Sequence, residues 1–208
     1  MRGVEPTMVL ESEGVEVWAL DLARARPAAP GELSPAEERR GSRRVSEADR
    51  RRFSASHAAL RRLLAAKTGI DPAALRLEEG PHGRPFLPGG PSFSMTHAED
   101  LWLCAVAPGR ELGIDGERIR PVPEARDIAA RWFTPRERER VAADEADGRG
   151  DAFLRGWVRK EAFLKALGVG FSVEGATAMD PDPQRWAVVD LDPAPGYVGA
   201  LVVNRRHP

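Results

Sequence analysis

The sequence predicts an α+β fold made of two comparable halves. Three observations predict it. Strand-like alternation and helix-like spacing of apolar residues occur in both halves, and neighbouring strands are joined by short turns rich in Pro and Gly. A length of 208 residues is enough for one sizeable domain or two small ones.

The N-terminal half begins with a strand and two helices. Residues 14–22 (GVEVWALDL) alternate as a strand does. A loop then leads to Ser34, which can cap a helix that has Pro in its first position and Glu37 in its third. A second helix is predicted from about residue 47 to 66, because apolar residues recur at helical spacing and Gly69 stops the pattern.

A hairpin is predicted at the junction of the halves. Residues 101–107 (LWLCAVA) form an apolar strand, and the short link PGRE leads to residues 112–119 (LGIDGERI). This separation suits a hairpin, which would bring Asp115 and Glu117 back beside Cys104.

The sequence pattern of the C-terminal half predicts three helices and two strands. One helix lies within residues 123–132, a second begins at Thr134, and a third covers residues 151–167 after an acidic loop. Residues 185–204 predict two strands joined by a Pro/Gly turn.

The composition argues against several classes of protein. No apolar run approaches the roughly 18 residues of a membrane span, and the N-terminus lacks a secretory pattern, so we expect a cytoplasmic protein with no membrane partner. Cys104 is the single cysteine, which allows no internal disulfide and suggests a buried residue without redox chemistry.

The net charge of −1 identifies no partner, but arginines crowd residues 39–62. A polyanion could dock there. A solvated helix face explains the same pattern, because the chain has only three lysines and uses Arg as its ordinary surface cation.

Two carboxylates stand one residue apart in the segment GIDGER. Asp115 and Glu117 would share one face of a strand and would repel each other unless a cation sits between them. The alternative is a polar strand face that meets solvent.

A third carboxylate, Glu161, falls near the middle of the apolar face of the helix at 151–167. A buried unpaired charge costs several kcal/mol, so a cation or a function must compensate it. Lys165 shares this face and Lys160 lies away from it. The alternative is a simple salt bridge between Glu161 and Lys165, worth about 0.2–0.5 kcal/mol when exposed.

Together, the three carboxylates predict a magnesium site. They supply only the hard oxygen ligands that Mg²⁺ prefers, and the chain has no Cys/His cluster for zinc. With Lys165 and Arg84 as nearby cations, such a site suits phosphoryl chemistry.

Seven segments of the chain carry a family resemblance: LSPAEERR, ADRRRF with LRRLLA, GPHGRP, FSMTHAEDLWLCAV, LGIDGER, RWFTPRE and WVRKEAFLKALGVG. The motifs GIDxE and WxxKExxxKxxGxG would each be a weak signal alone, but their combination at this separation, with Thr-His just upstream, is specific. With these segments the chain resembles the Sfp-type 4′-phosphopantetheinyl transferases from about Leu33 to Phe171.

The resemblance implies a reaction between coenzyme A and an apo acyl or peptidyl carrier protein. Asp115, Glu117 and Glu161 would bind Mg²⁺, or Mn²⁺ in its place, on the pyrophosphate of coenzyme A. A carrier serine would attack the phosphorus that bears the pantetheine arm and release adenosine 3′,5′-bisphosphate. Glu161 would deprotonate the serine, and Lys165 would neutralise the leaving group, with Asp115 the third catalytic residue.

The resemblance also implies a set of residues that bind coenzyme A. His97, Thr96 and Arg84 would bind the nucleotide end, including its 3′-phosphate. The full set is Arg40, Arg44, Arg84, Thr96, His97, Lys160 and Lys165. This chain departs from the family pattern at Thr96, where a serine is usual, and at Arg84, where a lysine is common.

Family members are built from two similar α/β halves related by a pseudo-twofold axis, with the active site at their interface. The resemblance therefore implies a monomer with an N-terminal half at 1–110, which holds the coenzyme A-binding elements, and a C-terminal half at 111–208, which holds the metal-binding carboxylates. It also suggests service to secondary-metabolite synthases and no nucleic acid partner.

Two other functions compete with this one. A magnesium-dependent phosphodiesterase or nuclease would also use clustered carboxylates, but Glu117 lacks a lysine two residues on. A non-catalytic module that binds coenzyme A or a carrier protein would not need all three carboxylates.

Overall fold

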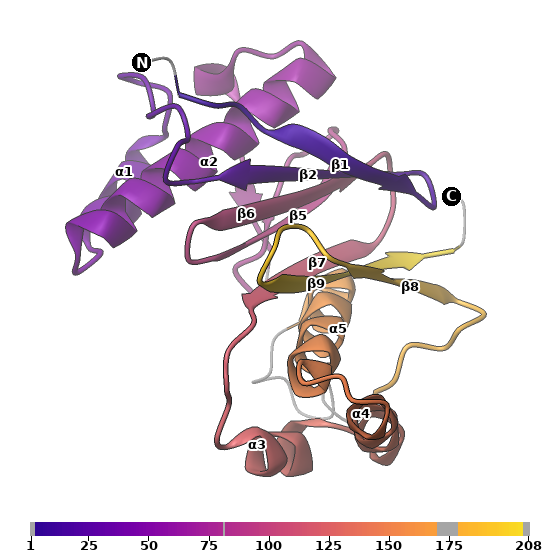
Figure 1. Cartoon of the computed structure of the whole chain (residues 1–208). Coiled ribbons are helices and arrows are strands. Elements are labelled where there is room, and N and C mark those ends of the chain that lie inside the picture. The colour runs from indigo at the N-terminus through magenta and orange to yellow at the C-terminus, as the bar shows by residue number, and fades with distance from the viewer. Residues whose placement is uncertain (1–2, 81, 170–178, 206–208) are drawn as a thin grey trace.

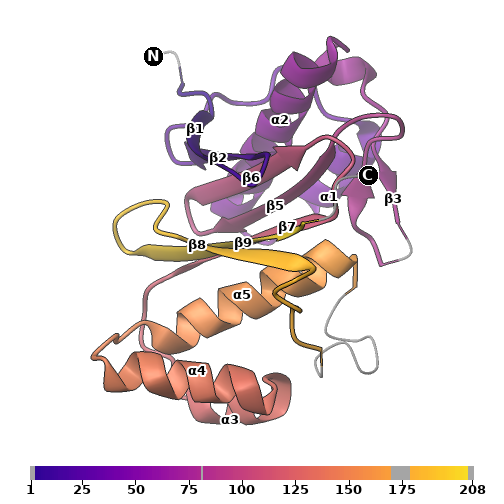
Figure 2. The ribbon, with the colours of Figure 1, turned by 90° about the vertical axis from the view of Figure 1, so that its right-hand side faces the viewer.

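The computed structural model describes residues 3–80, 82–169 and 179–205. Two antiparallel sheets lie face to face between helices, with α1 and α2 outside one sheet and α5, α4 and α3 outside the other (Figures 1 and 2). This arrangement confirms the prediction of an α+β fold.

The first sheet has the strand order β1-β2-β6-β5 and the second has the order β7-β9-β8. A separate pair of two-residue strands, β3 and β4, forms a small ribbon. The strands are β1 (Thr7–Ser12), β2 (Val15–Asp21), β3 (Glu78–Glu79), β4 (Pro85–Phe86), β5 (Ser92–Ala98), β6 (Leu101–Ala107), β7 (Leu112–Arg118), β8 (Trp186–Leu191) and β9 (Tyr197–Asn204).

The helices lie close to where the sequence predicts them. Both predicted N-caps form capping boxes, because the side chains of Ser34 and Thr134 accept hydrogen bonds from the backbone three residues on. Gly69 ends the second helix in the left-handed conformation that favours glycine. The helices are α1 (Pro35–Ser42), α2 (Glu47–Thr68), α3 (Ala125–Trp132), α4 (Pro135–Ala146) and α5 (Ala152–Leu167), with a 3₁₀ turn at Pro72–Ala74.

The predicted hairpin between β6 and β7 is wrong. Both edges of β6 are already paired, with β2 on one side and β5 on the other, so the link after β6 carries the chain into the second sheet. There β7 pairs with β9, and Asp115 lies opposite Ala200 instead of beside Cys104. Alternation identifies both strands but does not identify their partners.

The two sheets share a core. Alternate residues of β2 and β6 pack against alternate residues of β7 and β9, and this layer includes Val17, Leu103, Ile114 and Leu201, none of which is exposed. The outer face of β6 packs on α2, where Trp102 and Cys104 are fully buried. Burial raises the pKa of the Cys104 thiol, which fits the expected buried residue without redox chemistry.

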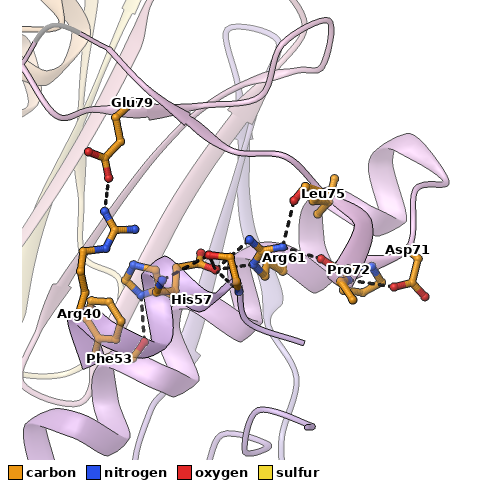
Figure 3. A network of polar contacts seen from close by, with 11 residues as sticks. Arg40, Phe53, His57, Arg61, Asp71, Pro72, Leu75 and Glu79 are labelled. Atoms are coloured by element: carbon orange, nitrogen blue, oxygen red, sulfur yellow. Dashed lines mark hydrogen bonds and ion pairs between the residues drawn. The ribbon is translucent and has the colours of Figure 1, made fainter. Parts of the chain in front are cut away.

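A buried ion pair between Arg61 and Glu37 attaches α2 to α1, and Figure 3 shows Arg61 with its contact to Pro72. Arg61 Nε donates to Glu37 Oε2 at 2.8 Å, and Arg61 Nη1 donates to the carbonyl oxygen of Pro72 at 2.7 Å. Burial alone would raise the pKa of Glu37, but hydrogen bonds from Ser34 and the charge of Arg61 hold this pKa below its usual value. The helix cap is therefore also a tertiary contact.

Among the described residues, no helix has the length and hydropathy needed to cross a membrane.

His57 gives the N-terminal half a pH-dependent stability. Its ring stacks on Phe53 with centroids 3.9 Å apart, and its Nδ1–H donates to the carbonyl oxygen of Phe53 at 2.9 Å. Burial lowers the pKa of His57 to about 4. Below about pH 6.5, His57 is protonated in the unfolded chain but stays neutral in the folded chain. The free energy of unfolding therefore decreases as the pH falls from about 6.5 towards 4.

We predict that His57→Gln removes part of this acid sensitivity. Between pH 7 and pH 5, the wild type should lose about 2 kcal/mol more unfolding free energy than the variant, as measured by urea denaturation. His82→Gln, in an exposed loop, is the control and should behave as the wild type does. An equal loss in His57→Gln and wild type would contradict the account.

Candidate active site

The site begins where β7 touches α5. A Cβ atom at Gly113 would lie 2.1 Å from the carbonyl oxygen of Ala162 and 2.5 Å from the amide nitrogen of Ala166. Only glycine allows the strand and the helix backbones to approach this closely. The strand and the helix lie side by side (Figure 2), and Asp115 of β7 thereby meets Lys165 of α5.

Asp115 is the most buried charged group of the site, with 3% of its surface exposed. Its Oδ1 accepts a hydrogen bond from Thr96 Oγ1 at 2.9 Å and pairs with Lys165 Nζ at 2.5 Å. Asp115 therefore joins the edge strand of each sheet, β5 and β7, to the last turn of α5.

Glu161 faces the same ammonium group from a greater distance, 3.9 Å between Oε2 and Lys165 Nζ. The pKa of Glu161 is raised to about 7, first by burial and then by the negative charge of Asp115, while Lys165 and a hydrogen bond from Trp157 act in the opposite direction. A carboxylate that titrates near neutral pH is suited to accept a proton.

Glu117 completes the carboxylate set. Burial raises its pKa, Arg120 at 3.5 Å lowers it, and the charge of Asp115 raises it. The predicted alternative of a solvated strand face does not describe these two residues, since Asp115 is buried and Glu117 is half-buried.

The donor chemistry of the three carboxylates fits a hard divalent cation. All their ligand atoms are oxygens, and such a cation would remove the repulsion that raises the pKa of Glu161. Within the described ranges, however, no three His, Cys, Asp or Glu side chains are gathered closely enough to hold a metal ion. Lys165 instead neutralises Asp115 in this arrangement.

Lys160 lies apart from this cluster. It was expected on the side of the helix away from the apolar face, but its side chain is fully buried and donates to Glu137 Oε2 and to the carbonyl oxygen of Met179, both at 3.0 Å. The side chain is buried because α4 covers this side of α5, and its position apart from Glu161 and Lys165 agrees with the expectation. Its role at a phosphate stays a prediction.

Arg84 reaches the site from the turn between β3 and β4. Its guanidinium donates to three main-chain carbonyl oxygens, of Lys165 at 2.5 Å and of Phe93 and Leu112 at 2.9 Å each.

Thr96 and His97 belong to opposite faces of β5. Thr96 reaches Asp115, whereas His97 lines a separate pocket of about 280 Å³ on the α2 side. Arg40 is not among the residues of that pocket and pairs with Glu79 (Figure 3). The pocket is lined by Arg43, Arg44, Val45, Asp49, Arg52, Phe53 and His97.

Some residues that the structure brings to these places received no role from the sequence, although the matching segments contain them. Trp157 hydrogen-bonds Glu161, and the spacing of four residues on one helix face could have indicated this contact. Arg52 and Phe53 line the His97 pocket, but only the tertiary packing of α2 on β5 reveals it.

The chain has clear relatives of known family. The 4′-phosphopantetheinyl transferase HetI of Nostoc sp. is 31% identical to it over 215 residues, which cover 95% of this chain and 91% of that protein. The chain belongs to the 4′-phosphopantetheinyl transferase superfamily. The model of this superfamily matches residues 111–198, a range that contains all three carboxylates and Lys165.

Two further relatives of this transferase support the same assignment. A putative 4′-phosphopantetheinyl transferase of Synechocystis sp. is 35% identical over 164 residues, 76% of this chain and 66% of that protein. The 4′-phosphopantetheinyl transferase of Bacillus subtilis is 36% identical over 115 residues, 54% of this chain and 50% of that protein. The family predicted from the motifs is therefore confirmed.

We predict that Gly113→Ala destabilises the protein, because its methyl group would meet the backbone of α5. The expected loss is about 2–3 kcal/mol of unfolding free energy, measured by denaturant unfolding. Gly150→Ala is the matched control, since a Cβ there meets nothing within 4 Å. If both variants unfold at the wild-type denaturant concentration, the close approach does not constrain the site.

Proposed function

We propose that this transferase moves the 4′-phosphopantetheine arm of coenzyme A to a serine hydroxyl of an apo acyl or peptidyl carrier protein. The observation that carries the proposal is the cluster of Asp115, Glu161 and Lys165, in which a carboxylate with a pKa of about 7 faces an ammonium group. The cluster lies in the segment matched by the family model.

The serine oxygen forms a new bond to the phosphorus that bears the pantetheine arm. The bond from this phosphorus to the bridging oxygen of the pyrophosphate breaks, and adenosine 3′,5′-bisphosphate leaves with the electron pair. The serine proton passes to Glu161, directly or through water. The raised pKa of Glu161 supports this role, since it makes the carboxylate a stronger base than an exposed glutamate.

Lys165 neutralises charge that develops on the leaving phosphate. Its ammonium group is already held in the cluster by Asp115 and by the carbonyl oxygen of Ile114 at 3.3 Å, so little reorganisation is needed to present it. Thr96 donates its hydroxyl group to the same oxygen of Asp115, Oδ1, and so restrains this carboxylate.

Asp115, Glu117 and Glu161 are the residues that would hold Mg²⁺, or Mn²⁺ in its place. Bound there, the ion would supply charge neutralisation at the pyrophosphate of coenzyme A. The all-oxygen donor set supports this assignment.

The nucleotide end of coenzyme A would bind on the other face of β5. The pocket beside His97 carries the guanidinium groups of Arg43 and Arg44, which suit a phosphate, while Arg52 already pairs with Asp100 at 2.8 Å. Arg40 would join it only after leaving Glu79.

The carrier would present its serine to the cluster, and the same geometry suits acyl and peptidyl carriers. We propose that the chain acts as a monomer and serves secondary-metabolite synthases, as the family resemblance suggests. No contact of the described residues favours the phosphodiesterase.

The test is the intact mass of a purified apo carrier protein after incubation with this protein, coenzyme A and Mg²⁺. We expect a gain of one phosphopantetheine arm that EDTA prevents. Glu161→Gln should lower the rate about 10²-fold or more without changing stability, because it removes the proton acceptor. Glu139→Gln, on the exposed side of α4, is the control and should keep wild-type activity.

Normal turnover in Glu161→Gln would contradict the assignment of the base. Absence of any gain in mass across several carrier classes, with coenzyme A binding retained, would instead favour the binding module.

A further inference from the structure

Arg84 donates hydrogen bonds to three main-chain carbonyl groups, and an arginine that served only to bind a phosphate would not need them. Its three acceptors belong to three different elements: Lys165 to the last turn of α5, Phe93 to β5 and Leu112 to the start of β7. The guanidinium therefore lies where the two sheets and the active-site helix meet.

The geometry of these hydrogen bonds limits what else Arg84 can bind. Nη2 donates to both Phe93 and Leu112, so both of its hydrogens are used. A guanidinium grips a phosphate with two parallel N–H groups on one edge, and each edge that can do so includes Nη2. Arg84 can thus offer a phosphate only single hydrogen bonds, from Nε and the remaining Nη1 hydrogen.

The contact with Lys165 connects Arg84 to the reacting groups. The carbonyl oxygen of Lys165 accepts from Arg84, while its ammonium group pairs with Asp115. Carbonyl groups in the last turn of a helix carry partial negative charge, which a cation stabilises. Because this hydrogen bond holds the backbone of Lys165 in place, it also sets the position from which the Lys165 side chain extends.

We propose that Arg84 is a positioning residue that holds the end of α5 against β5 and β7 and so keeps Lys165 on Asp115, and that it is not a ligand of the 3′-phosphate. The inference concerns the proposed transfer reaction and rests on it. It replaces the role that the family resemblance implies for this position.

The test compares Arg84→Met and Arg84→Lys with wild type, using coenzyme A and 3′-dephospho-coenzyme A as substrates. We expect kcat to fall about tenfold or more in both variants, because misplaced charge in a catalytic site is costly. The ratio of kcat/KM for the two substrates should stay within about twofold of wild type, since the 3′-phosphate contact is untouched. Lys should not restore kcat, because one ammonium group cannot span three carbonyl oxygens.

Two arginines serve as controls. Arg44→Met removes a cation beside His97 and should lower the preference for coenzyme A over its dephospho form. Arg76→Met changes an exposed residue and should leave activity and stability at wild-type values.

A large fall in affinity for coenzyme A but not for the dephospho form in Arg84→Met, restored by Lys, would overturn the proposal. Thermal unfolding without substrate separates this failure from failure of the proposed function. The midpoint should fall by about 5 °C in Arg84→Met, because buried carbonyl groups lose their donors. An unchanged midpoint would overturn the positioning role even if wild type transferred nothing.

Discussion

The close contact between β7 and α5 at Gly113 is the constraint on which the active site depends. With no side chain at this position, the strand lies directly against the helix backbone, and the next residue on the same face, Asp115, pairs with Lys165 in the same part of α5. Thr96 reaches the same carboxylate from the other sheet. The site is therefore assembled from both sheets and one helix, and each part holds the others in place.

The charges of the active-site side chains determine which groups the site can bind. Asp115 and Glu161 share the cluster with one close ammonium group, and burial, followed by the charge of Asp115, raises the pKa of Glu161 to about 7. The carboxylates of this cluster outnumber its ammonium group, and this excess of negative charge favours the binding of a cation. The separate arginine-rich pocket on the far side of β5 offers the opposite charge, which suits the phosphates of the same substrate. The two faces of β5 thus separate the proposed cation site from the arginine-rich pocket.

Short sequence motifs correctly predicted where helices begin and end. The caps at Ser34 and Thr134 and the stop at Gly69 follow from hydrogen bonds and backbone angles within a few residues. The sequence also placed Lys165 on the face of α5 that carries Glu161, and the two side chains do lie near each other, whereas the metal site of the three carboxylates stays a prediction. Strand partners were not predicted, because β6 gains its neighbours from segments distant in the chain. Lys160 faces inward because α4 forms a second layer, which a single helix pattern cannot reveal.

The central claim is that Asp115, Glu117 and Glu161 form one divalent cation site when coenzyme A is bound. Mn²⁺ titration followed by electron paramagnetic resonance tests this claim most directly, with coenzyme A alone as the blank. We predict one bound Mn²⁺ per chain in the presence of coenzyme A, with binding about tenfold weaker or more in Glu117→Gln. Equal affinity in Glu117→Gln and wild type, or no binding above the blank, would contradict it.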